Sequence, residues 1–429
     1  MSASNTADAP GATVVDALAA RPGGRELLEL GEQREDLALV GGAVRDLLRG
    51  AVPRELDVTV DGSAAELAAE LARMLATQGA SLPETALHDR FGTAVLEWEQ
   101  GRIDVAARRA ESYPRPGALP EVRPADARED LARRDFTVNA MAVPLGGPQR
   151  GRLQAVEHAL EDLAAARLRV LHERSFIEDP TRLLRLGRYR ARLRFEVETH
   201  TAGLAQAALA AGALATVSGA RVGAELRLAV DEGAAAALSS LSELGVLGGL
   251  ALPSPFDEQL LLAAGELMTP DASPRVLAMA VLLHPPQGSH AAARARAEEL
   301  LRSFELLAEE RERVLAGAFG AETLAAEIEG ATRPSQLRRV LAAAPVEAVA
   351  LAGALGSARA PEIPERARAW LSQLRGVRLQ IGGADLLAAG LPEGPDIGRR
   401  LARVLDLRLD GELADGRAAE LRAALEAPA

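Results

Sequence analysis

The sequence predicts an α+β protein in which a small mixed-sheet head domain precedes a long all-α part. Short runs that are rich in Val, Ile and Thr, or that alternate between apolar and polar residues, lie before residue 145, and such runs are typical of strands. After residue 155 the apolar residues recur at helical spacing, with breaks at Gly and Pro. A chain of 429 residues has room for more than one domain.

Five strands are expected in the head, because each run is either β-branched or alternates with period two. They lie at residues 37–40, 56–60, 92–98, 102–106 and 141–145. A helix is expected between the second and third strands, at residues 64–76. The later helices include "EDPTRLLRLGRYRARL" (178–193), "SGARVGAELRLAV" (218–230) and residues 308–316.

The composition excludes several classes of site. There is no cysteine, which rules out disulfides and thiolate metal ligands. All basic residues are arginine, so any cationic site must use guanidinium groups. No apolar run reaches the ~18 residues that a membrane span needs. Residues 1–12 have no charged segment before an apolar core, so no signal peptide is expected and the protein is predicted to be cytoplasmic.

Charge is unevenly distributed. The net charge of −12 argues against a nucleic-acid partner, but residues 1–100 carry −9, residues 101–190 carry +4 and residues 191–429 carry −7. The local sign governs contact with phosphates better than the overall charge does. The middle segment is therefore a candidate phosphate-binding region, although a solvated face would also explain it.

Two carboxylates stand on one face of the second strand. In "ELDVTV" (55–60), Glu55 and Asp57 share a face with Thr59, and the three apolar residues share the other. Cα atoms two residues apart on a strand are separated by ~6.6 Å, so the carboxylates can converge on two divalent ions ~3.5–4 Å apart, as in phosphoryl-transfer sites. The alternative is an exposed edge strand whose acids aid solubility.

A glycine pair precedes this strand. Gly41 and Gly42 follow the first strand and lead into a helix, and Arg45 and Asp46 follow in its first turns. Glycines let a phosphate approach the backbone, and a helix N-terminus favours negative charge. A lone glycine pair more often marks a simple tight turn.

A third acid, Asp104, lies on the strand at 102–106. A neighbouring strand could bring it beside Glu55 and Asp57. The alternative is a strand-end acid that pairs with Arg102 or Arg108.

The segment "LVGGAVRDLLRG…ELDVTV" (39–60) resembles the first motif of class II nucleotidyltransferases, the group that contains bacterial CCA-adding enzymes and poly(A) polymerases. Similar segments follow in the family's order at residues 90–122, 130–142, 175–198, 217–226 and 381–401. The chain departs from the family pattern at Glu55, where Asp is usual, and at Ala220, where Glu is usual.

The resemblance implies a small mixed-sheet nucleotidyltransferase head followed by an elongated all-α neck, body and tail. The expected parts are a flexible N-terminus (1–24), the head (25–148), a helical neck with the nucleotide-selecting motif (149–215), a helical body (216–375) and a helical, tRNA-binding tail (376–429).

The resemblance also assigns roles to residues. The expected catalytic residues are Glu55, Asp57 and Asp104, of which Glu55 and Asp57 hold two Mg²⁺ ions. The expected nucleotide-binding residues are Gly41, Gly42, Arg45, Asp46, Arg133, Arg134, Asp135, Asn139, Glu178, Asp179, Arg182 and Arg185.

Within this set, Asp179 and Arg182 suit base selection. Cytosine and adenine both present an amino donor beside a ring-nitrogen acceptor, which a carboxylate and a guanidinium can read. The resemblance implies this role, with Glu178 holding Arg182. Without the resemblance, "EDPTR" would be a capped helix start with an internal ion pair.

Two further segments have expected roles. Arg133 and Arg134 suit phosphates, and Asp135 and Asn139 suit ribose hydroxyls, although a salt-bridged start of a strand is the alternative. Residues 111–122 hold three prolines and a glycine, so they should not join a core strand ladder. The resemblance makes them the mobile element that governs the switch from C to A addition, and a plain surface loop is the alternative.

The expected function is template-independent addition of C, C and A to the tRNA 3′ end from CTP and ATP. The expected partner is tRNA, contacted at its acceptor and TψC arms. The alternatives are CC-only or A-only addition, a poly(A) polymerase, and an inactive RNA-binding relative.

Overall fold

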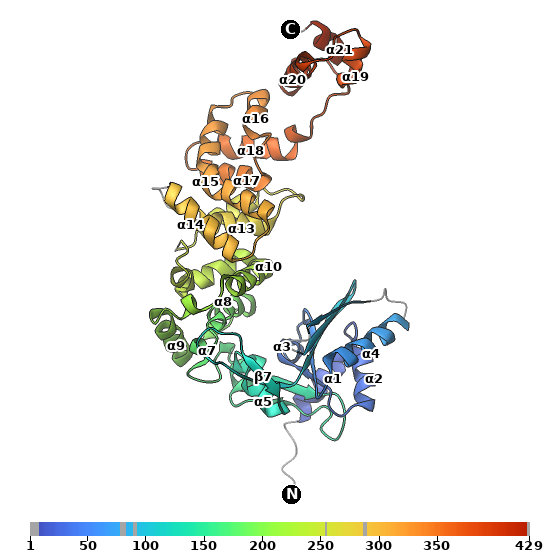
Figure 1. The fold of residues 1–429 in the computed structure, drawn as a ribbon, viewed down its shortest axis with the longest axis vertical. Coiled ribbons are helices and arrows are strands. Elements are labelled where there is room, and N and C mark those ends of the chain that lie inside the picture. The colour runs from blue at the N-terminus through green and yellow to red at the C-terminus, as the bar shows by residue number, and fades with distance from the viewer. Residues whose placement is uncertain (1–7, 78–82, 89–91, 254, 286–289, 427–429) are drawn as a thin grey trace. The chain divides into compact units, whose positions relative to one another are not determined.

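The computed structural model describes residues 8–77, 83–88, 92–253, 255–285 and 290–426. The chain divides into two compact units, Met1–Val217 and Ser218–Ala429 (Figure 1). This division lies two residues beyond the predicted end of the neck, so the predicted head and neck share the first unit. The predicted body and tail share the second unit.

A seven-stranded mixed sheet forms the head, in the order β3-β4-β5-β2-β1-β8-β9. Strand β2 is parallel to β5 and antiparallel to β1, which places it in the middle of the sheet. All five predicted strands are confirmed, whereas β3 and β9 were missed, because β3 contains one β-branched residue and β9 has only two residues. The strands are β1 (Ala38–Val40), β2 (Leu56–Val60), β3 (Glu84–His88), β4 (Thr93–Trp98), β5 (Gly101–Ala107), β8 (Met141–Pro144) and β9 (Gln154–Ala155).

Helices α1 to α4 of the first unit share a core with this sheet. The predicted helix at 64–76 is confirmed as α4, whose Leu67 and Leu71 lie four residues apart and are buried with Val58 of β2 in one core. The helices are α1 (Asp8–Ala19), α2 (Gly24–Gln33), α3 (Gly41–Leu48), α4 (Ala64–Thr77), α5 (Ala127–Ala132), α6 (Ala159–Ala164), α7 (Ser175–Glu178), α8 (Thr181–Leu193), α9 (Thr199–Ala210) and the 3₁₀ turns η2 (Thr137–Asn139) and η3 (Ala213–Thr216).

The structure differs from the expected flexible N-terminus (1–24) over the part that it describes, which begins at residue 8. Helix α1 spans Asp8–Ala19, and its Val14 and Leu18 are fully buried in the head core. These two residues lie four apart and therefore on one helix face. Burial of that face stabilises a segment that was expected to be flexible.

The Pro-rich segment 111–122 also differs from its expectation in part. Strands β6 (Arg109–Ser112) and β7 (Glu121–Pro124) form an antiparallel hairpin, so the two ends of the segment do join a ladder. This ladder is separate from the core sheet, as the prolines require. Another small sheet pairs β10 (Arg167–Leu168) with β11 (Glu196–Val197).

The described part of the second unit is helical, as predicted. Helix α15 packs against α13 and α17, and the buried carboxylate of Glu347 on α17 pairs with Arg313 on α15. Helices α19 to α21 share a small core of their own around Leu386 and Val404. The helices are α10 (Gly219–Glu243), α11 (Val246–Gly249), α12 (Glu258–Gly265), α13 (Pro274–Leu283), α14 (His290–Ser303), α15 (Ala308–Gly330), α16 (Pro334–Leu341), α17 (Val346–Gly356), α18 (Glu362–Ser372), η4 (Leu374–Gly376), α19 (Gly383–Ala388), α20 (Pro395–Leu409) and α21 (Arg417–Glu426).

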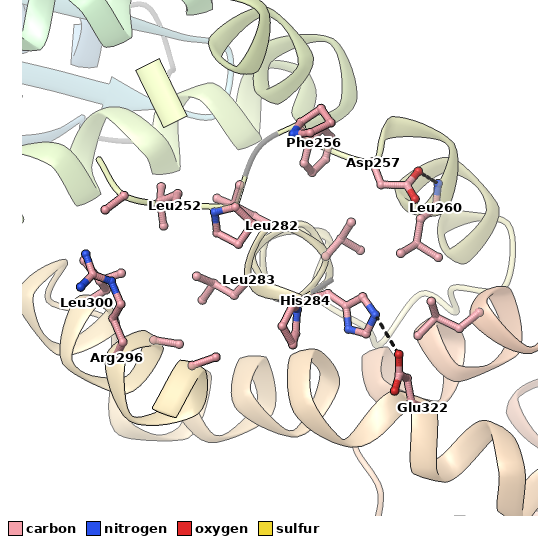
Figure 2. A pocket seen from close by; sticks show the side chains of 18 residues that line it. Leu252, Phe256, Asp257, Leu260, Leu282, Leu283, His284, Arg296, Leu300 and Glu322 are labelled. Carbon is pink, nitrogen blue, oxygen red and sulfur yellow. Dashed lines mark hydrogen bonds and ion pairs between the residues drawn. The ribbon is translucent and has the colours of Figure 1, made fainter. Parts of the chain in front are cut away.

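A mostly apolar cavity of about 810 Å³ lies in the second unit around the C-terminal end of α13 (Figure 2). Its polar residues include His284, which faces Glu322 at 3.8 Å and contacts the Ala318 carbonyl through Nδ1. None of the predicted site residues lines it. Over the described ranges, no helix combines the length and apolarity that crossing a membrane requires.

Candidate active site

The carboxylate strand lies at the centre of the head sheet. Asp57 of β2 is directly paired in register with Asp104 of β5, and Glu55 comes immediately before β2. The central position excludes the edge-strand alternative. Asp57 is half-buried and Thr59, on the same face, is buried, so this polar face is covered toward the end of the strand.

The charge around Asp57 fits a cation. Burial, together with the neighbouring carboxylates of Glu55 and Asp104, raises the pKa of Asp57 to about 7, against the opposing effect of Arg134 and Arg45. A divalent cation would relieve this repulsion. Among the described residues, no three acidic or histidine side chains converge as a metal-ligand set. A two-carboxylate site suits Mg²⁺, which keeps water and substrate phosphates as its other ligands.

Asp104 has the position of a third active-site acid and also forms the ion pair that was its alternative role. It lies beside Asp57, as expected for a third active-site acid, and it also accepts two hydrogen bonds from Arg102, of 2.7 and 2.9 Å. The Arg102 pair is partly exposed, and such pairs contribute little to stability. Its catalytic role stays a prediction.

The glycine pair meets the carboxylate strand at Gly41. This residue has a φ of +69°, which favours glycine, and begins α3. A Cβ atom on Gly41 would lie 2.7 Å from Nη1 of Arg134 and 3.7 Å from Oδ2 of Asp57. The start of α3, the carboxylate strand and a guanidinium therefore come together at one point.

Arg45 and Asp46 lie beneath this point rather than in the open. Both are buried, and Nε of Arg45 donates to Oδ1 of Asp46 at 2.8 Å. Arg45 also donates through Nη1 to Oδ1 of Asn139. The Arg45 side chain is thus held inside the protein, and its predicted contact with a triphosphate would require these bonds to rearrange.

The two arginines of "RRD" have different surroundings. Arg133 donates to Asp130 and to Glu111, as the salt-bridge alternative predicted. Arg134 donates to Asp130 at 3.0 Å through Nη2, and its Nη1 lies near Gly41. Although burial opposes it, the two guanidiniums lower the pKa of Asp130 below its ordinary value. Arg134 is the better placed of the two to reach a phosphate at the glycine pair.

Asp135 and Asn139 form a buried pair. Oδ1 of Asp135 accepts from Nδ2 of Asn139 at 3.0 Å, and Oδ2 lies 2.9 Å from Nη2 of Arg185. Burial opposes ionisation, but Arg185 and the Asn139 hydrogen bond lower the pKa of Asp135. The structure thus joins three predicted nucleotide-binding residues, and their contact with ribose stays a prediction.

Asp179 and Arg182, the pair predicted to select the base, lie at the start of α8. Arg182 is buried, and it donates to Oγ of Ser175 at 2.6 Å and to the Arg133 carbonyl at 2.7 Å. Asp179 is buried and accepts from the Thr181 hydroxyl at 2.6 Å. The structure differs from expectation at Glu178, which pairs with Arg174 at 3.0 Å. Ser175 and a backbone carbonyl, not Glu178, hold Arg182.

Tyr113, which was not among the predicted site residues, lies close enough to Asp179 to be affected by its charge. It lies in the hairpin loop, its hydroxyl donates to Glu111 at 3.1 Å, and burial with the charges of Glu111 and Asp179 raises its pKa to about 12. In the same loop the Gly117 N–H donates to the Glu178 carbonyl. The hairpin loop therefore lies against the base-selecting segment, and a tyrosine within a Pro-rich loop was the available signal.

Comparison with known proteins gives consistent matches. Residues 37–169 match the poly(A) polymerase head domain. A CC-adding tRNA nucleotidyltransferase from Deinococcus radiodurans is 33% identical over 91% of this chain and 90% of its own. An A-adding tRNA nucleotidyltransferase from Geobacter sulfurreducens is 32% identical over 92% of this chain, which spans about half (46%) of that relative. The solved apo form II of a CCA-adding enzyme aligns with a TM-score of 0.76 and 25% identity, covering 96% of this chain and 97% of that one.

Gly41→Ala should destabilise the first unit by about 1–2 kcal/mol, the cost of a left-handed conformation in a residue with a Cβ. The added methyl would also press on Arg134. Urea unfolding would be followed by Trp98 fluorescence in a Trp370→Phe background, because these are the two tryptophans.

Gly42→Ala is the matched control. Its Cβ would lie 3.4 Å from the Arg45 guanidinium, and alanine favours a helix interior over glycine. Equal stability of the two variants would contradict the account of Gly41.

Proposed function

The chain belongs to the tRNA nucleotidyltransferase family, and we propose that it adds nucleotides to the 3′ end of tRNA from CTP and ATP, releasing pyrophosphate. The observation that carries the proposal is the meeting of Asp57, Asp104, Gly41 and Arg134 at one point of the head. Negative charge for a cation, an open backbone and a guanidinium are what a triphosphate requires. The tRNA and nucleotide substrates place this activity in the cytoplasm.

Glu55 and Asp57 would hold two Mg²⁺ ions. When bound, Mg²⁺ stabilises charge on the triphosphate and lowers the pKa of the attacking 3′-hydroxyl. The crowding that raises the pKa of Asp57 supports this assignment. Glu55 is one methylene longer than Asp, yet it offers the same oxygen donors.

Gly41, Gly42 and Arg134 would bind the triphosphate. Gly41 leaves space where a side chain would collide with Arg134, and the N-terminus of α3 directs backbone N–H groups toward the same place. Arg45 supports the seat from inside through Asp46 and Asn139.

Arg182 and Asp179 would select the base. A guanidinium has five N–H donors, and two of those of Arg182 are used by Ser175 and the Arg133 carbonyl. These two bonds fix the plane of the group, and the remaining donors can read the ring nitrogen of C or A. Asp179 would accept from the exocyclic amino group of either base.

Full addition of C, C and A is the proposed outcome, with the acceptor and TψC arms of tRNA bound by the helical neck, body and tail. The relatives named above as CC-adding and A-adding keep CC-only and A-only addition as second candidates. The names of these two relatives do not decide between CCA, CC-only and A-only addition, since both relatives align with most of this chain.

The test is nucleotide incorporation into tRNA transcripts that lack CCA, end in CC or are complete. We expect CTP and then ATP to be added to the first, ATP alone to the second and nothing to the third, with activity lost in EDTA. Asp57→Asn should abolish addition, while Asp61→Asn, an exposed acid beyond the end of β2, should not.

The outcomes separate the candidates. Two C without A supports CC-only addition, A on the CC-ending transcript alone supports A-only addition, and repeated A on any RNA supports a poly(A) polymerase. No incorporation with any transcript would contradict the proposal.

Arg182→Ala should weaken base choice. A base contact is worth ~1–3 kcal/mol, so discrimination against UTP and GTP should fall by about 5- to 150-fold. The measurement is kcat/KM for each nucleotide on the same transcript. Arg174→Ala removes the same charge from an exposed position nearby and should leave the ratio unchanged. Unaltered base choice in Arg182→Ala would refute the assignment.

A further inference from the structure

Three side chains attach one face of α8 to the head. Arg185, Tyr189 and Arg192 are spaced four and three residues apart, so they lie on the same side of the helix. Arg185 pairs with Asp135 at 2.9 Å, and Arg192 pairs with Asp46 at 3.3 Å. Between them the Tyr189 ring packs edge-on against the Phe136 ring, with centroids 5.9 Å apart. The Arg45 guanidinium lies over the Tyr189 ring.

Asp46 is the point where two helices meet. Its Oδ1 accepts from Arg45 of its own helix at 2.8 Å, and its Oδ2 accepts from Arg192 of α8 at 3.3 Å. Asp46 is 4% exposed, which makes its charged hydrogen bonds stronger than those of a surface pair. The helix that begins with the glycine pair is thereby joined to the helix that begins with Arg182.

The Asp46–Arg192 contact lies where it can set the orientation of α8. Arg192 lies ten residues after Arg182 on one continuous helix, a separation of ~15 Å along the axis. Arg182, Arg185 and Tyr189 attach only the first two-thirds of α8. A second attachment near the far end sets the direction of the axis, and with it the place of Arg182 relative to the phosphate seat.

We propose that the Asp46–Arg192 ion pair is a positioning contact that sets base discrimination by fixing α8 relative to α3. This rests on the proposed function and deepens it. Asp46 then acts through α8 and not by touching the nucleotide, which departs from the expectation drawn from the sequence. Arg192 was not among the predicted site residues.

The test is discrimination by Arg192→Met, which keeps the aliphatic stem and removes the charge. On the transcript and nucleotide that the parent uses best, we expect the ratio of kcat/KM over that for UTP and GTP to fall at least about tenfold, since a displacement of ~1 Å can cost 10²-fold. Arg192→Lys, which keeps the charge, should retain most of the ratio. Arg194→Met, an exposed arginine at the C-cap of the same helix, should match the parent.

Several results would overturn the proposal. Parent-like discrimination in folded Arg192→Met would refute it, as would an equal loss in Arg194→Met. If Arg192→Met fails to fold, Arg192→Gln is used in its place. Parent-like discrimination in Arg192→Gln would refute the proposal in the same way. A parent chain that adds no nucleotide would refute the proposed function and this proposal together, whereas an active parent with an unaffected variant refutes positioning alone.

Discussion

A series of hydrogen bonds and ion pairs, buried except at its two terminal arginines, joins helix α3 to helix α8, and the arrangement of the site depends on it. From Arg192 it passes through Asp46, Arg45, Asn139 and Asp135 to Arg185. A guanidinium is planar and bonds two partners at once, which is how Arg45 serves both Asp46 and Asn139. Each inner member bonds two partners, so removing one member weakens the attachment of both of its neighbours. The series therefore holds the proposed phosphate seat and the proposed base-selecting residues in one geometry.

The carboxylates of the head fall into two electrostatic classes. Asp130 and Asp135 are held ionised, because neighbouring arginines outweigh the cost of burial and lower each pKa. Asp57 has the opposite balance, since burial and two nearby acids raise its pKa to about 7. The first class can organise the protein by itself, while the second is relieved by a cation. This contrast distinguishes Asp57, a candidate metal ligand, from Asp130 and Asp135.

Local patterns explain what could be predicted from the sequence. Period-two alternation identified the strand of Asp57 and its polar face, and the glycine pair marked the start of α3. The partner of each arginine could not be predicted, because residues 101–190 contain 17 of them and spacing along the chain does not decide between them. The partner of Glu178 was predicted wrongly for this reason. Glu178 lies four residues from both Arg174 and Arg182, and in the structure it pairs with Arg174. The burial of α1 likewise depends on tertiary packing that its composition does not reveal.

The central claim is that the series of buried hydrogen bonds fixes α8 relative to the head sheet. The most direct measurement is the distance distribution between spin labels at Ala69→Cys on α4 and Arg194→Cys at the C-cap of α8, two exposed positions in a chain with no native cysteine. One narrow distribution is expected in the doubly labelled parent, with a broader or shifted one when Arg192→Met is added. An unchanged distribution in that variant would contradict the account.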